Sequence, residues 1–146
     1  MTFAFPAGWP RISSSLVYDD PKKAIDFLCK AFGFELQLLV EHDGVVAHSQ
    51  LVVEGGLIMV GDAKAEARPW RKSPRSVGGA NTQSLMVFVP DVEAHFEHAK
   101  KSGARIVTEP KTSDYGEEYW SDRSYECEDL EGHHWYFVQR LRDPKK

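Results

Sequence analysis

Four histidines stand in pairs whose spacing could place two imidazoles on one metal ion. His133 and His134 are adjacent, whereas His95 and His98 are three residues apart in a segment with helical periodicity. Adjacent strand residues point to opposite faces, so we expect His133 to brace the turn after Gly132 and His134 to point inward. For His95 and His98 we expect a solvated helix face, with a shared exposed ion as the alternative.

His48 and Gln50 form a different candidate, because they share one face of a long strand pattern. An imidazole beside an amide could supply an acid and a hydrogen-bond donor for chemistry, or two polar contacts for a bound ligand. The alternative is a pair of satisfied edge residues. The sequence has no Ser-His-Asp order, nucleophile elbow or phosphate-cradling glycine loop, which disfavours covalent catalysis and nucleotide binding.

Two loops combine charged and aromatic side chains. The first holds many cations, one acid and one tryptophan, namely Lys64, Glu66, Arg68, Trp70, Arg71, Lys72 and Arg75. It could be a mobile flap that brings an aromatic face and cations over an anionic or planar ligand, or a flexible solvated linker. In the second loop, Glu117 and Glu118 lie among aromatic residues that include Trp120. That loop could form an acidic rim for cationic ligands such as glycopeptide antibiotics, or it could simply cap the core.

Composition indicates one compact domain spanning residues 1–146. The chain is 42% hydrophobic and 12% aromatic, which is enough to bury a core. A formal net charge of -4 disfavours a general nucleic-acid surface. No stretch approaches the roughly 20 apolar residues of a membrane span, and the N-terminus does not read as a secretory signal. We therefore expect a cytoplasmic protein without nucleic-acid or membrane partners, in which Cys29 and Cys127 are reduced packing residues.

The elements that must position these residues occur twice. SLVYDDPKKAIDFLCKAFGF is echoed by SLMVFVPDVEAHFEHAKKSGA, and EGGLIMVG is echoed by EGHHWYFV. In each copy an alternating apolar run ends in Asp, an amphipathic helix follows, and a later strand opens with Glu-Gly. This repeat predicts two related half-domains with a cleft between them.

Each copy has the order βαβββ. In the first, residues 11–61, Asp20 is the expected N-cap of the helix and Gly33 its stop. Its strands are expected at 12–18, 35–41, 45–53 and 57–61. Residues 62–82 have the composition of a linker. In the second copy, residues 83–141, Asp91 caps a helix over 92–102, and strands are expected at 84–89, 105–108, 123–127 and 134–139.

This order, with the strings SLVYDDPKKAIDFLCKAFGF and DLEGHHWYFV, resembles the vicinal oxygen chelate superfamily of glyoxalase, bleomycin-resistance and extradiol-dioxygenase proteins. The most specific pieces are the strand-Asp-helix entry at Asp20 and the Asp-x-x-Gly-His-x-Trp turn from Asp129 to Trp135. The resemblance, closest to the bleomycin-resistance branch, implies an α+β fold. Two βαβββ modules would form an eight-stranded, U-shaped sheet around a funnel, with helices packed outside. In this superfamily the sheet and its funnel are often completed by a second copy in a homodimer.

In metal-using members of that superfamily, side chains from the first and last strands of each module hold a divalent ion in the funnel. The corresponding positions here are Ser13, Met59, Ser84 and Tyr136. Hydroxyl, thioether and phenol groups are weak ligands for divalent ions. A register shifted by two residues would bring in residues such as Ser15, Met86 or His134, of which only His134 could coordinate. We therefore expect no metal ion or other cofactor at this position.

The leading hypothesis is a metal-independent, homodimeric protein that sequesters an aromatic or amphipathic small molecule in the funnel. The second is a lyase, isomerase or dioxygenase of the same superfamily that holds one divalent metal ion through atypical ligands, first among them His48 and His134. A third is an interaction module that uses the fold only to dimerise. No catalytic residue is assigned. The expected ligand-binding residues are Ser13, Ser15, His48, Gln50, Met59, Trp70, Ser84, Met86, Trp120, His134 and Tyr136.

Overall fold

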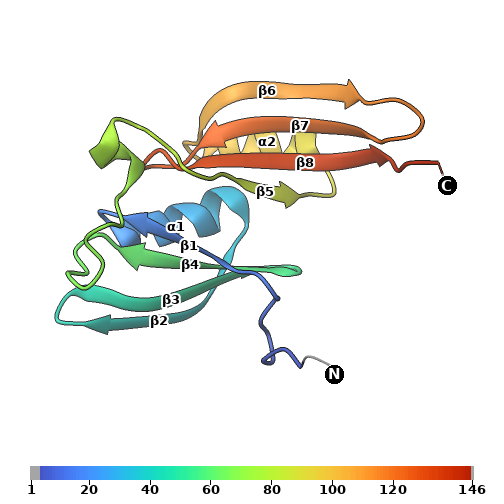
Figure 1. Cartoon of the computed structure of the whole chain (residues 1–146). Coiled ribbons are helices and arrows are strands. Elements are labelled where there is room, and N and C mark those ends of the chain that lie inside the picture. The colour runs from blue at the N-terminus through green and yellow to red at the C-terminus, as the bar shows by residue number, and fades with distance from the viewer. Residues whose placement is uncertain (1–3, 146) are drawn as a thin grey trace.

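The computed structural model describes residues 4–145, which form the two expected βαβββ modules (Figure 1). Module 1 consists of β1 (Ser14–Tyr18), α1 (Pro21–Phe32), β2 (Glu35–His42), β3 (Val45–Val53) and β4 (Gly56–Asp62). Module 2 consists of β5 (Leu85–Phe88), α2 (Val92–Lys101), β6 (Arg105–Asp114), β7 (Ser121–Glu128) and β8 (His134–Arg142). The connecting segment, residues 63–84, contains one short 3-10 helix, η1 (Pro74–Val77). The α+β fold class is confirmed.

Each module forms its own four-stranded sheet, with strand orders β1-β4-β3-β2 and β5-β8-β7-β6. The first strand of each module runs parallel to the last, and the remaining pairs are antiparallel. Within residues 4–145 the two sheets are not hydrogen-bonded to each other, so β1 and β5 each keep one edge without a strand neighbour. A single chain therefore leaves the U-shaped sheet in two halves.

Both helices begin and end where local chemistry predicts. The Asp20 side chain accepts a hydrogen bond from the backbone N–H of Lys23, and Asp91 accepts one from Ala94, so each carboxylate satisfies an orphan donor of the first turn. Gly33 ends α1 with φ at 81°, a left-handed conformation that glycine adopts without steric penalty. None of the described helices is long and apolar enough to cross a membrane.

One hydrophobic core is shared by both sheets and both helices. The Phe32 ring at the end of α1 lies 5.2 Å from the Trp135 ring and 4.8 Å from the Phe137 ring, centroid to centroid. Trp135 and Phe137 are fully buried, while Tyr136 between them points to the other side of β8, as the strand alternation predicts. Each sheet therefore has one face on the core and one face turned away from it, called here its open face.

The two cysteines contribute to this core as free thiols, as expected. Cys127 is buried and Cys29 is partly buried, and no disulfide joins them. Burial raises the pKa of the Cys127 thiol to about 12, with smaller contributions from nearby acids. Cys127 therefore stays protonated and behaves as a small apolar side chain.

The turn between β7 and β8 joins module 2 to module 1 through two buried carboxylates. Asp129 accepts hydrogen bonds from the Tyr18 hydroxyl at 2.5 Å and from Trp135 Nε1 at 3.0 Å. Glu131 accepts from the backbone N–H groups of Asp19 at 2.6 Å and Asp20 at 2.9 Å, just before α1. Because Tyr18, Asp19 and Asp20 belong to module 1, their bonds fix how the two modules sit on each other.

His95 is not on a solvated helix face, which corrects the expectation for this residue. Its Nδ1 lies 2.6 Å from the Tyr125 hydroxyl, its ring centroid is 4.1 Å from that of Phe137, and its Nε2 is buried without a hydrogen-bond partner. Val92, Phe96 and Ala99 form the buried stripe of α2, and His95 lies at the border of that stripe. His98 is exposed, and its Nε2 contacts the Lys30 carbonyl at 2.7 Å.

Burial of His95 predicts an acid-sensitive stability. Desolvation lowers the pKa of His95 below its ordinary value of 6.5. Because the unfolded chain binds this proton more readily, the contribution to stability is present above the unfolded pKa and is lost as the pH falls below it. The melting temperature should therefore drop between about pH 7 and pH 5 more steeply in the wild type than in His95→Gln. Parallel pH profiles, measured by circular dichroism, would contradict this assignment.

Candidate ligand-binding site

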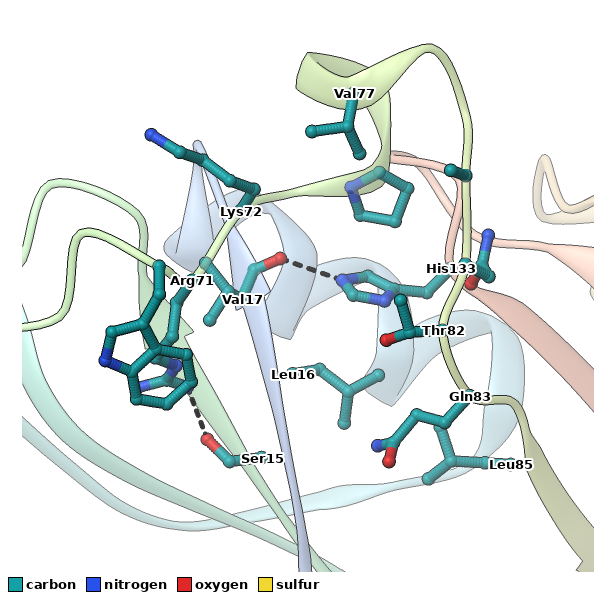
Figure 2. Close-up of a pocket in the computed structure, with 14 residues that line it drawn as sticks. Ser15, Leu16, Val17, Arg71, Lys72, Val77, Thr82, Gln83, Leu85 and His133 are labelled. Atoms are coloured by element: carbon teal, nitrogen blue, oxygen red, sulfur yellow. Dashed lines mark hydrogen bonds between the residues drawn. The ribbon is translucent and has the colours of Figure 1, made fainter.

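A cavity of about 530 Å³ lies where the two modules meet (Figure 2). Residues 15–17 of β1 form one wall, and residues 70–72 and 80–83 of the connecting segment form further walls. Pro74 and Val77 of η1, Leu85 at the start of β5 and His133 at the turn before β8 complete the lining. A cavity of this size is in the range that holds small organic ligands.

Arg71 reaches from the connecting segment onto the open face of the module 1 sheet. Its Nη2 donates a hydrogen bond to Ser15 Oγ at 2.6 Å, drawn as a dashed line in Figure 2. The guanidinium also lies against the backbone of Gly61 on β4, where a Cβ atom would stand only 2.7 Å from Arg71 Nη2. The absence of a side chain at Gly61 therefore leaves the space that the Arg71 guanidinium occupies against the sheet.

The charge of Arg71 is not neutralised by an acid of residues 4–145, since no carboxylate of this range pairs with it. Partial burial lowers its pKa from the usual range, and the neighbouring charge of Arg68 lowers it further. Arg75 on the same segment differs, because its Nε pairs with Asp19 at 2.9 Å. The cavity wall therefore carries a partly desolvated positive charge.

The opposite wall is fixed by polar contacts between the modules. His133 Nε2 lies 2.8 Å from the Val17 carbonyl oxygen, so His133 braces β1 in addition to its own turn (Figure 2). Gln83 Nε2 donates to Ser14 Oγ at 2.8 Å and holds the end of the connecting segment against β1. These contacts fix the connecting segment and the turn before β8 against β1, beside the cavity.

The predicted site residues of module 1, together with Trp70 of the connecting segment, divide between the cavity and the open face. Ser15 and Trp70 line the cavity. Met59 is in register with Ser15 on the adjoining strand, and the Ser13 hydroxyl is buried without a partner. His48 Nε2 and Gln50 Nε2 are 2.9 Å apart on β3, so these two side chains engage each other. Their role as ligand contacts stays a prediction.

The predicted site residues of module 2 gather around the open face of the other sheet. Met86 is in register with Tyr136, whose hydroxyl accepts from Ser124 Oγ at 3.1 Å. His134 Nε2 lies 2.9 Å from a Glu128 carboxylate oxygen. Of the remaining two, Ser84 is exposed just before β5, and the Trp120 ring lies 5.4 Å from the Arg140 guanidinium. Within one chain these residues are therefore on a different sheet from those of module 1.

The donors at the family's metal positions do not fit a divalent ion. They are two hydroxyls, a thioether and a phenol, and they are divided between the two sheets. His48 and His134, the alternative donors, also lie on different sheets. No group of three or more His, Cys, Asp and Glu side chains in residues 4–145 is placed to hold a metal ion.

Sequence reasoning missed several residues that shape the cavity. Arg71 was one of several cations in a loop, and Gly61 and Gln83 were given no role in the expected site. The nearest signal in the sequence was the excess of cations in this loop, because its single acid, Glu66, cannot pair with all of them. Which cation faces the cavity depends on contacts with β1 and β4, and no local pattern reports those contacts.

Two βαβββ modules that meet at a ligand-sized cavity define a protein of the glyoxalase fold class. The sequence model of the Glyoxalase/Bleomycin resistance protein/Dioxygenase superfamily matches residues 11–137, and the chain belongs to this superfamily.

Relatives span nearly the whole chain. The chain is 34% identical over 136 residues to two uncharacterised proteins, Mb0911c of Mycobacterium bovis and Rv0887c of Mycobacterium tuberculosis. Each match covers 92% of this chain; it covers 86% of Mb0911c and 76% of Rv0887c. TioX from Micromonospora sp. ML1 is similar with a TM-score of 0.69 at 35% identity, covering 89% of this chain and 98% of TioX. TnmS3, an antibiotic binding protein from Streptomyces sp. CB03234, shares the fold with a TM-score of 0.65 at 18% identity, covering 88% and 93%.

Proposed function

We propose that this protein binds a small molecule without a metal ion and sequesters an aromatic or amphipathic compound. The observation that carries the proposal is the replacement of strong metal donors by Ser13, Met59, Ser84 and Tyr136. Such side chains suit an organic ligand, because hydroxyls orient its polar groups and methionine adapts to its shape. The inter-module cavity has Trp70 in its lining and offers an aromatic surface near Ser15, the strand neighbour of Met59.

Superfamily membership supports a small-molecule binding role. TnmS3 shows that this fold can serve an antibiotic binding protein. At 18% identity that likeness extends to the fold alone, so the compound that TnmS3 binds is not carried over to this chain.

We further propose that a second copy of the chain completes the funnel. The free edges of β1 and β5 present unpaired backbone groups, which favour pairing with another strand. On β5, Met86 is 57% exposed and Phe88 is 54% exposed, an apolar surface that a partner would cover. Light scattering should therefore give the mass of a dimer, and Phe88→Glu should shift the population toward monomer. A wild-type monomer at all accessible concentrations would contradict the dimer.

Metal independence is tested by elemental analysis and by thermal melting with and without divalent ions. We expect a melting curve that is insensitive to zinc, manganese, nickel and a chelator, and that shifts upward with bleomycin or with a neutral flat aromatic such as 2-naphthamide. Stoichiometric metal with a metal-dependent melt would contradict the proposal and favour the enzyme hypothesis.

The funnel assignment is tested by two conservative variants. Ser13→Ala and Tyr136→Phe each remove one hydroxyl, so ligand affinity should fall by several-fold while the melting temperature of the free protein changes little. Ser102→Ala, at the C-terminus of α2, is the matched control and should leave affinity unchanged. If both funnel variants bind as tightly as the wild type, these residues do not line the site.

A further inference from the structure

We infer that Arg71 makes the inter-module cavity selective for compounds that carry an anionic group on a planar ring, such as aromatic carboxylates. This inference rests on the proposed small-molecule binding and names the chemical class of the ligand. It assigns the specificity to a residue of the connecting segment outside both sheets.

The Arg71 guanidinium is positioned by Ser15 and Gly61 of the module 1 sheet. Ser15 Oγ accepts a hydrogen bond from Nη2 at 2.6 Å, and Gly61 leaves room for the group against the sheet. Only one of the guanidinium's donor nitrogens is used by this contact, so the other N–H groups remain for a ligand. A planar fork of donors matches a carboxylate, which accepts two parallel hydrogen bonds.

The Arg71 guanidinium has no carboxylate counter-ion among residues 4–145. Three acids of the inter-module region are engaged elsewhere: Glu131 with the N–H groups before α1, Asp19 with Arg75, and Asp62 with the N–H groups of Val46 and Lys64. Glu66, the acid of the connecting segment itself, is exposed and makes no ion pair with Arg71. An anionic ligand would therefore supply the partner that the fold does not provide.

The other residues that line the cavity add a second cation, an aromatic ring and apolar side chains. Lys72 adds a second cation to the same cavity, and Trp70, with 77% of its surface exposed, adds an aromatic face. Leu16 and Leu85 add an apolar surface between them. This combination favours a ligand with a charged end and a flat apolar body over a purely neutral or a cationic one.

The inference is tested with 2-naphthoate and 2-naphthamide, which share one ring system and differ in charge. Wild-type protein should bind the carboxylate more tightly, as measured by calorimetry and tryptophan fluorescence. Arg71→Gln should weaken naphthoate binding by about tenfold or more, because a charge-assisted pair is lost, and should weaken naphthamide binding much less, because the amide loses at most a hydrogen bond to a neutral acceptor. Arg68→Gln removes the same charge from the same segment but does not line the cavity, so it should weaken naphthoate binding far less.

Gly61→Ala tests the geometry without changing the charge. Its Cβ would displace the end of the flexible Arg71 side chain, so affinity for naphthoate should fall while melting and circular dichroism report an intact fold. Equal binding of the two compounds, retained naphthoate affinity in Arg71→Gln, or an equal loss in Arg68→Gln would overturn the inference and leave small-molecule binding in place. Binding of neither compound to the wild type would count against both.

Discussion

Replacing Glu131 by alanine is expected to lower the free energy of unfolding by about 3–5 kcal/mol. The Glu131 side chain is 3% exposed, and its carboxylate accepts from two backbone N–H groups before α1 and from Ser73 Oγ at 2.6 Å. Removing the carboxylate leaves these donors buried without an acceptor and also empties the space it filled. Urea denaturation followed by circular dichroism measures the loss.

The control for this variant is Glu97→Ala, because Glu97 is exposed on α2 and has the same chemistry. We expect that control to change stability by less than about 0.5 kcal/mol. A loss below about 1 kcal/mol in Glu131→Ala would mean that solvent replaces the carboxylate, and the joint between the modules would have to lie elsewhere.

Asp129→Asn is expected to destabilise the protein by about 2–4 kcal/mol although it changes hardly any volume. Oδ2 receives donors from Tyr18 and Trp135, and Oδ1 receives the backbone N–H groups of Glu131 and His133. Both oxygens are surrounded by donors only. Whichever way the amide introduced by Asp129→Asn is turned, its NH₂ group faces N–H or O–H donors and cannot accept from them. The carboxylate has two acceptor oxygens and avoids this donor–donor clash.

A double-mutant cycle with Tyr18→Phe checks this reasoning. Because Tyr18 donates directly to Asp129, the two changes should be less than additive by about 0.5–3 kcal/mol in denaturant titrations. Asp143→Asn, at an exposed position, is the control and should be nearly neutral. Strict additivity, or an Asp129→Asn variant as stable as the wild type, would show that these bonds do not hold the modules together.

The same turn connects stability to the cavity. The Glu131 carboxylate accepts a hydrogen bond from Ser73, two residues after Arg71 in the connecting segment, and His133 contacts β1. Variants that loosen the turn should therefore weaken ligand binding as well as folding, whereas Arg71→Gln should affect binding alone. This difference separates the joint between the modules from the contacts that recognise the ligand.

Much of the fold could be predicted because its signals are local. Asp20, Asp91 and Gly33 mark the helices through the hydrogen bonds and backbone angles that helix ends require. The alternation around Tyr136 follows from the pleat of a single strand. β6 was expected at 105–108 but extends to Asp114, because pairing with β7 stabilises a polar sequence that lacks an alternating apolar pattern.

By itself the sequence determined the two modules, their superfamily and the weak metal donors at four positions. Periodicity, caps and residue chemistry act within a few residues and need no knowledge of the packing. Only the tertiary structure decided that Arg71 meets Ser15, 56 residues away, and that His95 enters the core. These outcomes depend on how the two modules and their connecting segment pack against each other. That packing is set by contacts between residues far apart in the chain.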